Sequence, residues 1–176
     1  MFLTSFGAKR PLDAELICEF QKKLTQNTCD TRRYQLGEWP GTYKLHDYVT
    51  GREETGAAAE DVGEEMDELL KEVSEIADKD ALTAVAYFHA KFENIYPFVD
   101  GNGRTGRLAM NYFLIQHNHP PIIIHEENRR AYYEVRDSVQ DLEPLRDFLR
   151  CETEKTWEKQ IVRVERCWER KQSLNF

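Results

Sequence analysis

The sequence predicts an all-α domain that carries one small β-hairpin. Charged residues make up 32% of the 176 residues, whereas the chain has only 9 glycines and 6 prolines, a balance that favours helices over a sandwich of short strands. Apolar residues recur at helical spacing along most of the chain. A hydrophobic share of 40% is enough to form a core, and the length fits one domain spanning residues 1–176.

Each helix is predicted from apolar residues that return every three or four positions. Asp80 is a suitable N-cap for the third helix, and Pro97 ends that helix. Residues 26–41 are expected to form a loop, residues 43–50 a small hairpin, and residues 122–124 a short buried segment. Helices are expected at 11–25, 60–78, 81–96, 104–116, about 126–138 and about 141–172.

The net charge of −8 is concentrated between Arg52 and Asp80, which hold twelve acids and three bases. An acidic chain does not collect phosphates along a duplex, so broad nucleic-acid binding is excluded, while a small phosphate pocket is not. No apolar run is long enough for a membrane span, and the N-terminus lacks the order of a signal peptide, so we expect a cytoplasmic protein. The four cysteines contain no C-x-x-C pair, which argues against a disulfide framework or a zinc site.

The segment from Tyr96 to Arg107 is the part of the chain that indicates chemistry. Gly101 and Gly103 flank Asn102, which allows the backbone to turn its N–H groups toward one point. The following helix adds the positive end of its dipole, so the segment predicts an anion site. A G-N-G sequence alone is also an ordinary turn.

The side chains of this segment make the anion site more specific. Arg104 and Arg107 are three residues apart on one helical face and can bind phosphate oxygens. Asp100 offers a carboxylate for Mg²⁺, which commonly uses one or two carboxylates together with phosphates of the substrate. No Gly-Lys-Ser/Thr sequence occurs, so the site is not a P-loop. A di- or triphosphate site is predicted.

The same segment resembles the signature of the Fic (Fido) family, His-x-Phe-x-Asp/Glu-Gly-Asn-Gly-Arg-x-x-Arg. The resemblance extends to the flanks at 89–95 and 108–114, and more loosely to 37–41, 44–51, 130–136 and 141–149. It covers roughly residues 10–150 and leaves 151–176 as a C-terminal helical extension. The matching positions are Pro97, Phe98, Asp100, Gly101, Asn102, Gly103, Arg104 and Arg107.

The resemblance implies a scaffold that binds ATP or another nucleotide with Mg²⁺ and moves AMP onto a hydroxyl side chain of a target protein. By the family pattern, Asp100 would hold Mg²⁺, and Gly101, Asn102, Gly103 and Arg104 would bind the phosphates. Arg107 would reach the γ-phosphate and belongs to the catalytic set.

Two weaker assignments also come from the resemblance. Tyr132 or Tyr133 would line the adenine pocket, although both are also ordinary core or rim residues. The flap residues Asp47, Tyr48, Val49 and Thr50 would align a target segment by strand addition.

Tyr96 departs from the pattern, because the family places its catalytic histidine there. A general base needs a pKa near the working pH; imidazole has an ordinary pKa of about 6.5, whereas a phenol, at about 10, is roughly 0.1% ionised at pH 7. Losing a general base costs about 10²–10⁴ in rate. We therefore expect nucleotide binding with little or no AMP transfer. Natural pseudoenzyme, deliberate inactivation and escape from toxicity all fit this tyrosine.

Other residues leave the choice of function open. His46, in the flap, is the best substitute base, and His89 is expected to be packed. No Ser/Thr-x-x-x-Glu-Gly/Asn inhibitory helix occurs, so regulation would come from a separate inhibitory partner or from self-association into a homo-oligomer, or would not be needed. The alternatives to a transferase are a non-catalytic nucleotide-binding interaction module and a Doc-like phosphotransferase toxin; Gly101 disfavours the latter, since Doc-like motifs usually carry alanine there.

Overall fold

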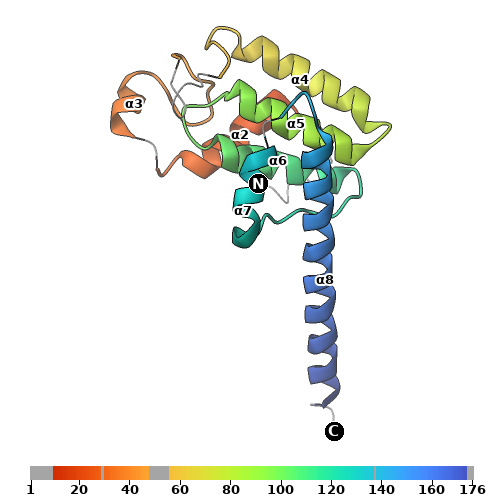
Figure 1. Ribbon diagram of the computed structural model, residues 1–176. Coiled ribbons are helices and arrows are strands. Elements are labelled where there is room, and N and C mark those ends of the chain that lie inside the picture. Colours follow the sequence, from red (N-terminus) through yellow and green to blue (C-terminus); the bar gives the residue numbers. More distant parts are fainter. Residues whose placement is uncertain (1–9, 29, 48–55, 137, 174–176) are drawn as a thin grey trace.

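The computed structural model describes residues 10–28, 30–47, 56–136 and 138–173, and Figure 1 shows their arrangement. Within these ranges every regular element is a helix, which confirms the predicted all-α class. The elements are α2 (Ala14–Thr25), α3 (Thr31–Gln35), α4 (Val62–Ala77), α5 (Ala81–Ile95), α6 (Asn102–Gln116), the 3₁₀ helix η1 (Glu126–Asn128), α7 (Arg129–Val135) and α8 (Glu143–Ser173).

Helix α5 lies at the centre and packs against α4, α6 and α8. It buries its apolar face almost completely, including Val85, Phe88 and Phe92. Full burial of a side chain of this kind contributes about 1.5–3 kcal/mol. As predicted, Asp80 caps the helix, because its Oδ1 accepts hydrogen bonds from the N–H groups of Leu82 (3.0 Å) and Thr83 (3.2 Å). The central position of α5 fixes the loop that follows it.

Helix α6 crosses close to α5 because Gly106 has no side chain at the contact. A Cβ at Gly106 would lie 3.0 Å from Cδ1 of Phe92, closer than nearly all real contacts. Ala109 and Met110 continue the buried face of α6. The close approach brings the N-terminus of α6 beside the C-terminus of α5.

Several predicted boundaries differ from the structure. The first helix begins at Ala14 because the carboxylate of Asp13 accepts from the N–H of Leu16 at 2.7 Å. The expected loop at 26–41 contains α3, a short helix that Asp30 caps in the same way. The helix expected at about 126–138 divides into η1 and α7 and ends at Val135.

The small hairpin is found in none of the residues that the structure describes. Residues 43–47 form no strand, and the expected strand residues Tyr48, Val49 and Thr50 lie outside the described ranges. In the predicted buried segment, Ile122 is buried but Ile123 is 47% exposed. Burial at one position in three is typical of a chain crossing the edge of the core.

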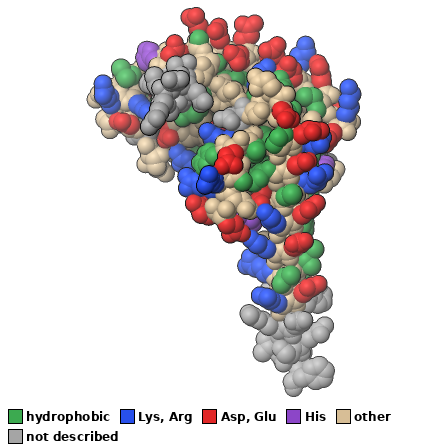
Figure 2. All heavy atoms as spheres, in the orientation of Figure 1, with side chains coloured by type: hydrophobic (Ala, Val, Ile, Leu, Met, Phe, Trp, Pro, Cys, Tyr) green, Lys and Arg blue, Asp and Glu red, His purple; other side chains and the backbone are tan. Residues whose placement is uncertain are grey.

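Helix α8 starts against the domain, and its C-terminal half projects away from it (Figure 1). Leu145 and Leu149 are buried, whereas Trp157 and Ile161 are about half exposed. Acidic side chains gather over α4, along the upper edge of Figure 2. None of the helices in the described ranges is long and apolar enough to cross a bilayer.

Candidate functional site

The loop between α5 and α6 begins and ends with a residue in the left-handed region. Tyr96 terminates α5 with φ 52° and ψ 60°, and Gly101 precedes α6 with φ 80°. A left-handed conformation costs a residue with a side chain about 1–2 kcal/mol, and such strain collects at functional sites. The two reversals turn the four residues between them into a tight loop above the N-terminus of α6.

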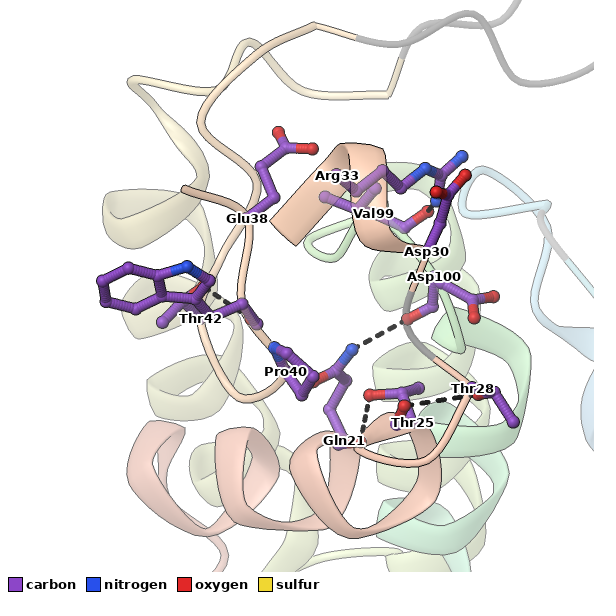
Figure 3. A pocket seen from close by; sticks show the side chains of 11 residues that line it. Gln21, Thr25, Thr28, Asp30, Arg33, Glu38, Pro40, Thr42, Val99 and Asp100 are labelled. Carbon is purple, nitrogen blue, oxygen red and sulfur yellow. Dashed lines mark hydrogen bonds between the residues drawn. The ribbon is translucent and has the colours of Figure 1, made fainter. Parts of the chain in front are cut away.

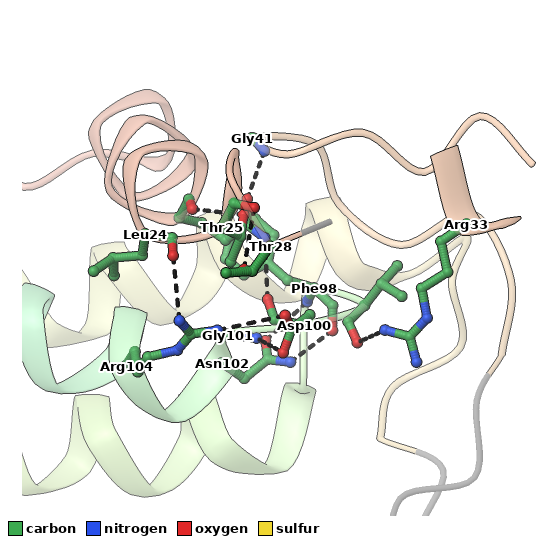
Figure 4. A network of polar contacts seen from close by, with 12 residues as sticks. Leu24, Thr25, Thr28, Arg33, Gly41, Phe98, Asp100, Gly101, Asn102 and Arg104 are labelled. Atoms are coloured by element: carbon green, nitrogen blue, oxygen red, sulfur yellow. Dashed lines mark hydrogen bonds and ion pairs between the residues drawn. The ribbon is translucent and has the colours of Figure 1, made fainter. Parts of the chain in front are cut away.

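Asn102 holds this loop closed from inside. Its amide donates to the carbonyl of Phe98 (2.6 Å) and its side-chain oxygen accepts from the N–H of Phe98 (2.9 Å), as Figure 4 shows. The side chain is only 2% exposed. Both polar groups of a buried backbone residue are therefore satisfied by one side chain, which makes the loop rigid.

The turn that the sequence predicts to bind an anion is the first turn of α6 itself. The helix begins at Asn102, two residues before the predicted start at Arg104, and its first internal hydrogen bond joins the N–H of Thr105 to the carbonyl of Gly101 (2.8 Å). A helix leaves its first N–H groups without internal partners, and its dipole makes this end positive. The sequence-predicted nest is thus a helix terminus, with Gly103 already helical.

The two glycines of the turn are needed for different reasons. At Gly101, with φ 80°, a Cβ would lie 2.7 Å from Cγ2 of Thr25. At Gly103, a Cβ would lie 3.2 Å from Nη1 of Arg107 and 3.6 Å from Oε1 of Glu93. The first glycine permits the turn, and the second leaves space for the guanidinium of Arg107.

Asp100 and Arg104 form the exposed front of the turn. Oδ1 of Asp100 accepts from the N–H of Gly101 (2.7 Å), and Oδ2 lies 3.4 Å from Nη2 of Arg104. Arg104 also donates to the carbonyl of Leu24 (3.2 Å). The side chains are 52% and 44% exposed, so the ion pair is weak and both groups can change partner.

The exposed front of the turn offers too few ligands to bind a magnesium ion by itself. Phosphate oxygens of a bound nucleotide would have to supply the remaining ligands. In the described part of the chain, no group of three or more His, Cys, Asp or Glu residues could hold a metal ion. Asp100 therefore offers one hard oxygen ligand. This matches Mg²⁺, which protein sites often bind through one carboxylate together with substrate phosphates and water.

Arg107 lies on the back of the turn, in a cavity of about 190 Å³. Tyr132 is buried there, with its hydroxyl 2.5 Å from Nε2 of His89. Tyr133 is 44% exposed, and Arg136 lies 4.8 Å from the centre of its ring. The structure thus brings Arg107 together with both predicted tyrosines. The cavity is lined by Arg107, Ile124, His125, Glu126, Arg129, Tyr132 and Tyr133.

The chain on both sides of residues 48–55 is attached next to Tyr96. The N–H of Lys44 donates to the carbonyl of Pro97 (2.9 Å), and the N–H of Ala57 donates to the carbonyl of Ile95 (3.0 Å). Asp47 accepts from the N–H of Ala59 at 2.8 Å. The residues on either side of Tyr96 therefore each accept one backbone hydrogen bond from this part of the chain. Tyr96 occupies the first position of the motif.

Sequence reasoning missed two side chains that hold the loop. Gln21 accepts from the N–H of Gly41 (2.5 Å) and donates to the carbonyl of Asp100 (3.0 Å), and Arg33 donates to the carbonyl of Val99 (2.7 Å). Both line a second, smaller cavity of about 70 Å³ beside Asp100 (Figure 3). The signal in the sequence was Gln21, a long polar side chain on the mainly apolar buried face of α2.

The two histidines considered as substitute bases occupy opposite environments. His46 is exposed, and His89 is fully buried. Burial, with smaller effects from Arg107 and Arg136, lowers the pKa of His89 to about 3. His89 is therefore neutral at pH 7 and packed, as the sequence predicts.

Comparison with known proteins agrees with the motif. The family model described as the Fic/DOC family matches residues 11–114. The chain belongs to this family. The protein adenylyltransferase Fic of Drosophila persimilis is 44% identical over 73 residues, which are 40% of this chain and 14% of that protein. The match thus spans a small part of the curated Fic relative.

Solved Fic structures share the fold. A Fic-domain-containing signalling protein from Bacteroides thetaiotaomicron superimposes with a TM-score of 0.70 at 25% identity, covering 86% of this chain and 63% of that one. BepC, a VirB-translocated Bartonella effector protein from Bartonella tribocorum with bound AMPPNP, superimposes with a TM-score of 0.62 at 17% identity, covering 81% of this chain and 75% of that one. The Fic fold is thus established for this chain.

Proposed function

We propose that this Fic chain binds ATP with Mg²⁺ at the N-terminus of α6 and is a protein adenylyltransferase scaffold whose AMP transfer is strongly impaired by Tyr96. The observation that carries the proposal is the intact turn from Asp100 to Arg107 with a tyrosine at its entrance. The adenylyltransferase name of the Drosophila relative and the AMPPNP bound to BepC support it.

The phosphates of the nucleotide bind at the N-terminus of α6, which is the positive end of the helix dipole. The N–H groups of the first turn and the guanidinium of Arg104 bind phosphate oxygens, and Arg107 reaches the terminal phosphate from the back. Asp100 would hold Mg²⁺ together with phosphate oxygens, and the ion would supply neutralisation of the phosphate charge. Because the loop is already closed by Asn102, the site needs little reorganisation when the nucleotide binds.

Tyr96 determines how much transfer remains. In AMP transfer, a target hydroxyl forms a bond to the α-phosphorus, pyrophosphate leaves, and a base takes the hydroxyl proton. A phenol is a poor base at pH 7, so the reaction loses about 10²–10⁴ in rate while phosphate binding persists. His46 is exposed and lies on the segment that leads to residues 48–55. It is the substitute base if transfer is retained.

The target is a second protein with an accessible serine, threonine or tyrosine hydroxyl. Segment 47–50, between the two attachment points beside Tyr96, is where an extended target segment adds by strand pairing. The protein works as one domain in the cytoplasm, and a separate inhibitory partner or self-association regulates it. The tyrosine also favours a second function, a nucleotide-binding interaction module without catalysis.

The test compares the unmodified protein with Tyr96→His. Calorimetry with Mg-ATP should detect micromolar binding to the unmodified protein, which at millimolar ligand adds about 4 kcal/mol to the free energy of unfolding. With α-labelled ATP and a target-rich lysate, Tyr96→His should transfer label at least 100-fold faster than the unmodified protein.

Two control variants make this result specific. Tyr96→Phe should stay at background, and adding Asp100→Ala to Tyr96→His should abolish the label. No binding at millimolar ATP would refute the pocket. Strong labelling by the unmodified protein would point to His46. Binding without labelling by Tyr96→His would favour the interaction module.

A further inference from the structure

One wall of the cavity that contains Arg107 is the segment 125–128, which leads into α7. His125 and Glu126 line the cavity together with Arg107. The 3₁₀ helix η1 within this segment is three residues long and has no buried residue. Helices of this kind have poor hydrogen-bond geometry and occur only in short pieces. Apolar burial within η1 therefore does not fix its position, which depends on polar contacts.

Glu152 on α8 supplies such contacts from inside the fold, where it is 0% exposed. Its Oε1 accepts a hydrogen bond from Nδ2 of Asn128 (2.7 Å), and its Oε2 accepts a longer one from the backbone N–H of His125 (3.4 Å). Oε1 also accepts from Nζ of Lys155, one turn further along α8 (2.9 Å). One carboxylate thus holds both ends of the segment 125–128 and pairs with a lysine of its own helix.

Packing of α8 against the domain does not require a carboxylate at this position. Leu145 and Leu149 bury apolar side chains earlier on the same helix. A buried charge loses its hydration, and replacing a buried ion pair by apolar residues is often neutral or stabilising. Two of the three donors that converge on Glu152 belong to the cavity wall. A fixed position for that wall is what the carboxylate provides and a leucine would not.

A second polar contact between α8 and the wall is weaker. Nζ of Lys159 lies 3.5 Å from Oε1 of Glu127, and the two side chains are 56% and 69% exposed. Exposed ion pairs of this kind contribute little, because water and salt screen them. The buried contact made by Glu152 is therefore the one that fixes the wall.

We infer that Glu152 is a positioning residue for nucleotide binding, which holds the segment 125–128 in the arrangement that leaves the Arg107 cavity open to a ligand. This rests on the proposed function. When the carboxylate is lost, the segment adopts other arrangements, and the apparent affinity falls with the share of molecules that keep the competent one. Helix α8 thus contributes to binding although none of its described side chains lines the cavity.

The test uses the full chain and measures its affinity for Mg-ATP by calorimetry. Glu152→Gln keeps the shape of the side chain but places an NH₂ group against one of the donors. It should weaken ATP about tenfold, as expected if the competent share falls to about a tenth. Asn128→Ala removes the same contact from the half-buried side and should weaken ATP by a similar factor, even if Glu152→Gln does not fold.

Thr156→Val is the matched control on the same helix. Thr156 is 7% exposed, lies one turn beyond Glu152, and donates its hydroxyl to the carbonyl of Glu152 (2.7 Å). The variant removes a buried hydrogen bond of α8 without touching the cavity wall. It should lower the melting temperature and leave the affinity for ATP unchanged.

A reciprocal exchange separates positioning from a general structural effect. Combining Glu152→Gln with Asn128→Asp restores an amide–carboxylate pair with donor and acceptor exchanged, and most of the affinity for ATP should return. Hydrogen exchange without nucleotide gives a second readout. The backbone N–H of His125 should exchange faster in Glu152→Gln than in the unmodified protein, and at an unchanged rate in Thr156→Val.

The outcomes distinguish this inference from the proposed function. If the unmodified protein does not bind Mg-ATP, the proposed function fails. If it binds, but Glu152→Gln and Asn128→Ala have no larger effect on affinity than Thr156→Val, positioning is refuted and nucleotide binding stands. The same conclusion follows if the reciprocal exchange recovers no affinity.

Discussion

The front and the back of the α6 turn hold their arginines in opposite ways. At the front, Arg104 is 44% exposed and makes contacts of 3.2 and 3.4 Å to Leu24 and Asp100. At the back, Arg107 lines a cavity together with Tyr132, a buried residue whose hydroxyl lies 2.5 Å from Nε2 of His89. The side chains of two arginines that are three positions apart on one helix thus differ in how freely they can move. The exposed arginine can exchange partners at little cost, whereas the half-buried one has less room to move because the cavity wall surrounds part of it.

Asn102 lies between the two sides, and its loss should have the largest effect on stability. Asn102→Ala leaves the buried N–H and carbonyl of Phe98 without their side-chain partner, and the free energy of unfolding should fall by about 3 kcal/mol. Urea unfolding followed by circular dichroism measures it. Nucleotide binding should be lost as well, because front and back share this loop.

Asn111 offers a matched control for that variant. It makes the same pair of hydrogen bonds with the backbone of Ile122, at 3.0 and 2.6 Å. Asn111→Ala should cost similar stability but leave ATP affinity unchanged in the folded protein. An equal loss of affinity in both variants would mean that Asn102 has no special role at the site.

The stability of the back should depend on pH through His89, with a smaller effect than the loss of Asn102. Burial, together with Arg107 and Arg136, lowers the pKa of His89 from 6.5 to about 3. Between these values the unfolded chain binds a proton that the folded chain excludes, so the free energy of unfolding falls as pH falls. We expect His89 to account for a loss of about 2 kcal/mol between pH 7 and pH 5. Unfolding curves at pH 7 and pH 5 measure this loss. In His89→Gln, the difference in the free energy of unfolding between the two pH values should be smaller by about 2 kcal/mol.

A substitution at the front of the turn should have the smallest effect on the free energy of unfolding. Arg104→Ala removes an exposed pair and should change the free energy of unfolding by less than about 0.5 kcal/mol. The same change should weaken ATP about tenfold, since the lost contact is to a charged phosphate. Thermal melting and calorimetry measure the two effects. A large loss of stability would contradict the contrast between front and back.

Local signals allowed the helices and the motif to be predicted from sequence. Asp80 and Pro97 define the ends of α5 because capping and the loss of an N–H act within a few residues. Asp100, Asn102 and Arg107 were identified from the same short segment. The prediction was wrong where a single capping residue was enough to start a short helix. Asp30 caps α3 inside the segment that was expected to be a loop.

The sequence by itself determined the helical class, the turn with two glycines at the start of α6, and the presence of Tyr96 where the motif has histidine, because each depends on residue type and short spacing. Only the tertiary structure decided that Gln21 and Arg33 hold the loop, and that His89 and Tyr132, 43 residues apart, meet behind Arg107. The placement of α2 and α3 beside the loop creates the first two contacts, and the placement of α7 near α5 creates the third. Helical spacing specifies which residues are buried, but the partner that each buried polar atom meets depends on how the helices pack against one another.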